Sequence, residues 1–131
     1  MKIQKSSEDY LEAMLMMQEK HGVIRSIDIA GQLGVTKPSV SYAVKRLREN
    51  GYITMDNDSH ITLTGSGMEI ARRIYERHRL LTEFFVRLGV DEDIAREDAC
   101  RVEHDLSDET FEAIKRHARR MKKEKKNTAE A

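Results

Sequence analysis

The sequence lacks the features typical of secreted and membrane proteins. Its 131 residues include one cysteine, one proline and no tryptophan, and aromatic residues make up 5% of the chain. A single cysteine cannot form an internal disulfide, so a reducing cytoplasm is the expected setting. No apolar run approaches the roughly 20 residues that cross a bilayer, and no signal-peptide pattern opens the chain. These absences exclude a disulfide scaffold and predict no membrane partner.

The charges balance in number but are unevenly distributed. Lysine and arginine total 23, as do aspartate and glutamate, which argues against a uniformly basic nucleic-acid binder. Residues 91–109, however, contain nine acidic residues against two arginines, whereas residues 21–50 contain five basic residues against two acidic ones. This distribution predicts that one part of the chain binds cations and another binds anions.

Three helices are predicted in the first half of the chain. Apolar residues at helical spacing predict a helix over residues 6–20 and a short second helix over residues 26–33. Thr36 is placed to cap a third helix, and Pro38 lies in the first turn of that helix, where its missing N–H costs nothing. The third helix carries hydroxyl and basic side chains on its outer face. Two short helices joined by a tight turn are typical of a helix-turn-helix.

A predicted β-hairpin follows these helices. Residues 52–55 and 60–63 are β-favouring runs, and a polar turn joins them. The helices alone would also fit an ordinary helical hairpin, but three helices followed by a β-hairpin are typical of a winged helix-turn-helix. We therefore predict a winged helix-turn-helix DNA-binding domain over residues 1–66.

The second half of the chain predicts a helical domain over residues 67–121, so the expected fold class is mainly α. Helical spacing of apolar residues predicts a long helix over residues 68–88, an acidic helix over residues 91–106 and a last helix over residues 107–121. Residues 122–131 form a basic tail without an apolar face, which is expected to be disordered.

Two groups of side chains have the chemistry of metal ligands. Cys100, Glu103 and His104 are three or four residues apart on the predicted acidic helix, so they should project from one face. A thiol, a carboxylate and an imidazole together suit Fe, Co or Zn better than Mg or Ca. Asp9 and Glu12 lie one turn apart in the first helix and also share a face. Each group also has an ordinary explanation, as a small apolar cysteine, solvated charges, or acids that stabilise a first helical turn.

The predicted third helix also carries the candidate DNA contacts. In a helix-turn-helix, the N-terminal part of the second helix of the motif enters the major groove. The expected contacts are Thr36, Ser39, Ser41 and Tyr42, with Pro38 among them, and Lys37, Lys45 and Arg46 on phosphates.

Several motifs occur in a fixed order along the chain. They are Ser7-Glu8-Asp9-Tyr10-Leu11-Glu12, Pro38-Ser39-Val40-Ser41, Leu63-Thr64-Gly65-Ser66-Gly67, Arg77-His78-Arg79-Leu80-Leu81 and Ala99-Cys100-Arg101-Val102-Glu103-His104, followed by Leu106-Ser107-Asp108-Glu109. Each motif is modest alone, but their order and spacing are specific. Together they cover nearly the whole chain, which resembles the metal-responsive repressors of the diphtheria-toxin-repressor family, including its manganese transport regulators.

The resemblance implies a homodimer that binds operator DNA through a winged domain in each subunit and dimerises through the helical domain. It implies Mn(II) or Fe(II) as the cofactor, with Co(II) or Zn(II) able to substitute. It also implies repression of genes for metal-ion homeostasis. The metal site that it implies consists of Asp9, Glu12, His78, Cys100, Glu103 and His104.

The implied site departs from both branches of that family. Manganese regulators usually carry Glu where this chain has Cys100, and iron regulators usually carry Met where it has Asp9. Iron regulators also place a Glu four residues after the histidine of the long helix, where this chain has Thr82. The site is therefore a hybrid that leaves Mn(II) and Fe(II) both open. The second metal site and the trailing SH3-like domain of iron regulators are expected to be absent.

Two other functions fit parts of the sequence. A winged-helix regulator that senses an organic ligand would leave the acidic, histidine and cysteine side chains structural, but few aromatic residues are present to line its pocket. A small metalloenzyme would use the cluster for hydrolysis. The chain has no His-Glu-x-x-His motif, and six protein ligands leave no open position for a substrate, so we predict no enzymatic activity.

Overall fold

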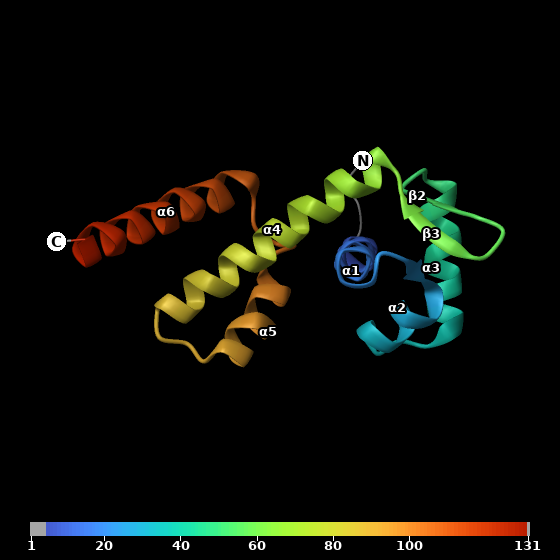
Figure 1. The fold of residues 1–131 in the computed structure, drawn as a ribbon, viewed down its shortest axis with the longest axis horizontal. Coiled ribbons are helices and arrows are strands. Elements are labelled where there is room, and N and C mark those ends of the chain that lie inside the picture. Colours follow the sequence, from blue (N-terminus) through green and yellow to red (C-terminus); the bar gives the residue numbers. More distant parts are fainter. Residues whose placement is uncertain (1–4, 131) are drawn as a thin grey trace. The chain divides into compact units, whose positions relative to one another are not determined.

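The computed structural model describes the backbone of residues 5–130 and the side chains of residues 5–121. The described residues form six helices and three strands, which are labelled in Figure 1. The chain divides into two compact units between Tyr75 and Glu76, which we call the DNA-binding unit and the helical unit. In chain order the elements are α1 (Lys5–His21), β1 (Ile24–Arg25), α2 (Ser26–Leu33), α3 (Lys37–Glu49), β2 (Ile53–Met55), β3 (His60–Leu63), α4 (Gly65–Arg87), α5 (Glu92–Val102) and α6 (Asp108–Glu130).

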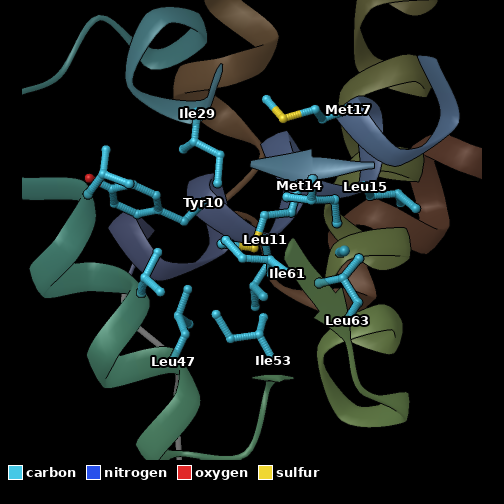
Figure 2. Packing of buried hydrophobic residues seen from close by; sticks show 14 residues of the cluster. Tyr10, Leu11, Met14, Leu15, Met17, Ile29, Leu47, Ile53, Ile61 and Leu63 are labelled. Atoms are coloured by element: carbon cyan, nitrogen blue, oxygen red, sulfur yellow. The ribbon is translucent and has the colours of Figure 1, made fainter. Parts of the chain in front are cut away.

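The core of the DNA-binding unit is built around α1. Leu11 and Met14 of α1 are fully buried, because apolar residues at helical spacing give this helix one continuous apolar face. Figure 2 shows side chains from α2, α3 and the strands, among them Ile29, Leu47 and Ile61, gathered around these two residues. Burial of each such side chain stabilises the unit by about 1.5–3 kcal/mol. The predicted first helix is therefore confirmed, and the structure places it at the centre of the core.

The predicted helix-turn-helix is confirmed in α2 and α3. Gly34 ends α2 in the left-handed region, with φ of 65°, which glycine adopts without strain. Thr36 then caps α3, since its Oγ1 accepts a hydrogen bond from the backbone N–H of Ser39 at 3.3 Å. Val40 and Leu47 are buried on the inner face of α3, which leaves the polar face of this helix in solvent.

The predicted hairpin is confirmed, and it belongs to a three-stranded sheet. β2 and β3 pair antiparallel with Thr54 opposite Thr62. In the turn, Asp56 Oδ1 accepts the backbone N–H groups of His60 and Asp58, each at 2.9 Å, and these bonds lower the pKa of Asp56. β1 pairs with the other edge of β3, with Ile24 opposite Ile61. The sequence does not predict β1, because two residues carry no periodic pattern.

The start of α4 packs closely against the hairpin of the DNA-binding unit. A Cβ added at Gly67 would lie 2.0 Å from the carbonyl oxygen of Tyr52, so α4 meets the hairpin at a point where only glycine fits. The first turns of α4 then pack Met68, Ala71 and Tyr75 onto the core of the DNA-binding unit. The compact DNA-binding unit consequently extends into α4 as far as Tyr75. The domain boundary after residue 66 stays a prediction.

The helical unit consists of the second half of α4 together with α5 and α6. Leu81, Ala95, Ala99 and Phe111 are buried in it. The backbone of α6 is helical through Glu130, whereas the sequence predicts a helix to residue 121 and then a disordered tail. The Lys, Glu and Ala residues beyond residue 121 are strong helix formers, which explains the longer helix. Among the described residues, no helix combines the length and apolarity needed to cross a membrane.

Candidate metal centre

The carboxylate of Glu103 is the central group of a cluster in the helical unit. Its Oε2 lies 3.0 Å from Nδ1 of His78 on α4, and its Oε1 lies 3.3 Å from Nε2 of His104. The side chain of Glu103 is 0% exposed and that of His104 is 2% exposed, whereas His78 retains 21% exposure. Of the sequence-predicted ligands in this unit, the structure therefore brings together His78, Glu103 and His104.

The donor set of this cluster fits a divalent transition metal. A buried carboxylate is costly unless it is paired, hydrogen-bonded or coordinated to a metal. Two imidazoles and one carboxylate are ligands that Mn, Fe, Co and Zn accept, whereas Mg and Ca prefer oxygen donors alone. Each oxygen of the Glu103 carboxylate faces a different imidazole nitrogen, so Glu103 is the group that His78 and His104 share.

The local backbone at Glu103 differs from the prediction. The sequence predicts one helix over residues 91–106, but α5 ends at Val102, and Glu103 is its C-cap, whose N–H donates to the carbonyl oxygen of Ala99 at 2.9 Å. Asp105 N–H then donates to Val102 O in the turn that follows. His104 therefore lies in a turn rather than on a helix, so simple helical spacing does not describe its direction.

Cys100 differs from Glu103 in its burial. Its side chain is exposed, while Glu103 is fully buried. Among the described residues, Cys100 belongs to no group of three potential ligands whose donor atoms all lie within 4.8 Å of one another. The prediction that Cys100, Glu103 and His104 share one helical face fails for His104, which lies in the turn after α5. A role for Cys100 as a ligand stays a prediction.

The DNA-binding unit holds the other two predicted ligands on α1. Asp9 is half-buried and Glu12 is buried, one helical turn apart. Their neighbour Glu8 is also buried, and its Oε2 pairs with Nη2 of Arg73 on α4 at 3.2 Å. The sequence does not reveal this ion pair. It shows that the start of α1 is built to carry buried carboxylates rather than only solvated first-turn charges.

Arg77 is a residue of the centre that the sequence analysis does not identify. It is 5% exposed and contacts the segment that carries Glu103 and His104. One signal points to it in retrospect. Arg77 lies on the buried apolar stripe of α4, three residues after Ile74 and four before Leu81, both of which are buried. A charged residue on such a stripe is rarely buried unless it has partners.

The outer face of α3 places the predicted DNA contacts in solvent. Lys37, Pro38, Ser41, Lys45 and the remaining candidates are all exposed. Two candidates also have local partners, since Thr36 Oγ1 donates to Ser39 Oγ at 2.8 Å. The guanidinium of Arg46 lies over the ring of Tyr42, 5.8 Å from its centroid, an arrangement that favours a cation–π contact.

Comparisons with known proteins give a consistent result for both units. The N-terminal DNA-binding domain of iron-dependent repressors matches residues 2–61, and the metal-binding and dimerisation domain of the same repressors matches residues 64–128. An uncharacterized HTH-type transcriptional regulator of Methanocaldococcus jannaschii is 38% identical over 112 residues, which cover 84% of this chain and 90% of the relative. The transcriptional regulator MntR of Escherichia coli O6:H1 is 37% identical over 108 residues, which cover 82% of this chain and 70% of the relative.

A solved structure agrees with these relatives. A manganese-dependent transcriptional repressor in complex with manganese superposes with a TM-score of 0.77 at 31% identity, over 86% of this chain. The chain spans about half of that protein, since the match covers 52% of it.

Proposed function

This chain belongs to the family of iron-dependent repressors, and we propose that it binds operator DNA as a homodimer when loaded with Mn(II) or Fe(II). Members of this family are metal-dependent transcriptional repressors, so the chain is a regulator and not an enzyme. The proposed targets are genes of metal-ion homeostasis, in the cytoplasm. The observation that carries the proposal is the fully buried carboxylate of Glu103 between the imidazoles of His78 and His104.

We propose that the metal takes ligands from both units. His78, Glu103 and His104 come from the helical unit, and Asp9 and Glu12 come from one face of α1. Cys100 is proposed as a further ligand. The bound ion would supply positive charge among carboxylates that otherwise repel one another. Because the proposed ligands come from both units, metal binding would couple the helical unit to the DNA-binding unit.

The proposed DNA-reading element is the start of α3. Ser41 and Tyr42 are exposed near the N-terminal half of this helix, and hydroxyl groups read base edges or phosphates. Lys37, Lys45 and Arg46 would contact phosphates, which position a protein on DNA without specifying its sequence. Thr36 and Ser39 have a second role as the cap of α3, so their loss would also disturb the helix start.

Exposed apolar residues support dimerisation through the helical unit. Leu88 is 62% exposed just after α4, Ile94 is 52% exposed on α5, and Val86 is 42% exposed. Large apolar side chains that remain in solvent can mark a surface that binds another protein chain. We propose that a second copy of the chain covers these side chains. Sedimentation equilibrium measures the number of subunits in the assembly. A monomer at concentrations that occupy the operator would contradict the dimer.

The direct test of the proposed function is operator binding against metal concentration. The DNA probe is a palindromic fragment selected from a random library in the presence of Mn(II), because a symmetric dimer reads symmetric half-sites. Without oxygen, Mn(II) and Fe(II) should each raise DNA affinity by about 5–150-fold, the usual range for coupling between two ligand sites. Equal affinity in chelator and in excess metal would contradict metal control. A response to a small organic molecule in chelator would favour the organic-ligand regulator instead.

Replacement of Lys37 by alanine tests the assignment of phosphate contacts. The variant should bind all DNA sequences more weakly and flatten the dependence of log affinity on log salt concentration by about one unit. Fluorescence anisotropy across a salt series measures both quantities. Lys20→Ala, which removes the same charge from the exposed end of α1, is the matched control. A change in the preferred base with an unchanged salt slope would mean that Lys37 reads sequence rather than phosphate.

A further inference from the structure

Two consecutive residues of α4, Arg77 and His78, contact the backbone and the carboxylate of Glu103. Arg77 Nη1 donates to the backbone carbonyl oxygen of Glu103 at 3.0 Å. Nδ1 of the adjacent His78 lies 3.0 Å from the carboxylate of the same residue. Because both contacts start from one helix turn, the backbone position of Glu103 and the direction of its carboxylate are fixed together.

The contacts of Arg77 extend along the whole turn between α5 and α6. Arg77 Nη1 also donates to the carbonyl oxygen of Leu106 at 2.8 Å, and its Nη2 pairs with Asp108 Oδ1 at 2.5 Å. The guanidinium lies over the ring of Phe111, 5.0 Å from its centroid. A planar guanidinium presents several donors in a fixed geometry, so a single side chain can hold several acceptors in place. Arg77 thereby joins the end of α5 to the start of α6.

These contacts also hold the turn that follows α5. The last carbonyl groups of a helix have no partner within the helix. Arg77 binds the carbonyl oxygens of Glu103 and Leu106 from outside, which favours a turn at this point over further helix. The turn directs the side chains of Glu103 and His104 into the protein, where both are almost completely buried.

We propose that Arg77 is the positioning residue of the metal centre, which fixes the turn at residues 103–108 so that Glu103 and His104 are arranged for the ion before it binds. This inference rests on the proposed metal site and goes beyond it, because the guanidinium itself is not a metal ligand. A ligand that is held in its bound direction loses less freedom on binding, so metal affinity should depend on Arg77.

The substitution Arg77→Lys tests the inference. Lysine keeps the positive charge, but its single ammonium cannot reproduce the fork that reaches Glu103, Leu106 and Asp108. Co(II) affinity, measured from d–d absorption, should fall by about 10–100-fold, the effect typical of residues that orient metal ligands. The absorption spectrum of the Co(II) form should also change, because the ligand geometry changes. Arg72→Lys, an exposed position on the same helix, should leave both readouts unchanged.

Asp108→Asn provides a second variant that preserves the buried arginine. The side chain of Asp108 is 81% exposed, so the change removes only the charge of one partner of Arg77. Asp108→Asn should also lower Co(II) affinity, but by a smaller factor than Arg77→Lys. If Arg77→Lys does not fold, Asp108→Asn tests whether the contacts of Arg77 affect metal binding. Thermal unfolding of the metal-free proteins, followed by circular dichroism, separates folding from metal binding.

The outcomes of these experiments are distinct. Folded Arg77→Lys with the Co(II) affinity and spectrum of the wild type would overturn the role of Arg77. So would a lower unfolding temperature with unchanged Co(II) binding, since that result would make Arg77 a purely structural residue. Failure of the wild-type protein itself to bind Co(II) would instead overturn the proposed metal site. Weaker Co(II) binding with an altered spectrum and an intact fold supports the inference.

Discussion

Replacement of Glu103 by glutamine is expected to weaken metal binding by more than about 100-fold. Loss of a residue that only orients a metal ligand costs about 10–100-fold, and loss of the ligand itself should cost more. The carboxylate of Glu103 is fully buried and lies 3.0 Å and 3.3 Å from the nitrogens of His78 and His104. Glutamine fills almost the same volume and can still hydrogen-bond an imidazole, but it has no negative charge for the ion. The variant in excess Mn(II) should therefore bind operator DNA no better than the wild type in chelator.

The control for this prediction is Glu97→Gln. Glu97 is exposed on α5, so the substitution makes the same chemical change without touching the buried cluster. Isothermal titration with Mn(II), together with anisotropy of the operator probe, measures both effects in each variant. If Glu103→Gln bound Mn(II) as tightly as Glu97→Gln, Glu103 would not be a ligand and the proposed metal centre would have to be abandoned.

Replacement of Cys100 by glutamate is expected to shift the metal response toward Mn(II). A thiolate favours Fe(II) and Co(II), whereas Mn(II) prefers oxygen and nitrogen donors and is the most weakly bound metal in the intrinsic affinity order. The ratio of Mn(II) to Fe(II) activation should therefore rise, on the order of tenfold, the size typical of a single change around a metal. The variant should also lose sensitivity to oxidation, because Cys100 is the only thiol in the chain.

Cys100→Ser separates the two effects. Serine removes the oxidisable thiol but adds no carboxylate, so it should abolish the oxidation sensitivity without favouring Mn(II) to the same degree. Operator binding of the three proteins, titrated with Mn(II) and with Fe(II) in the absence of oxygen, provides the measurement. An unchanged activation ratio in Cys100→Glu would agree with the exposed position of Cys100 and would place this residue outside the metal site.

The features that the sequence predicts correctly are determined by residues close to one another in the sequence. Thr36 caps α3 because its side chain reaches an N–H three residues away, and Gly34 ends α2 because it adopts a positive φ. The apolar face of α1 follows from helical periodicity alone. Such short-range rules determine the winged helix-turn-helix. The motifs at the joints between elements identify the family, and they do so before any distance is known.

The arrangement of the candidate metal centre depends on contacts across the chain instead. Nothing between residues 91 and 106 marks the end of a helix, because the segment contains neither glycine nor proline. Arg77, more than 20 residues earlier in the chain, binds the carbonyl oxygens of Glu103 and Leu106 in the turn that follows α5. The sequence by itself therefore determines which side chains are suited to a metal. Only the tertiary structure decides that Glu103 and His104 are buried while Cys100 is exposed, because burial depends on packing between segments that are far apart in the sequence.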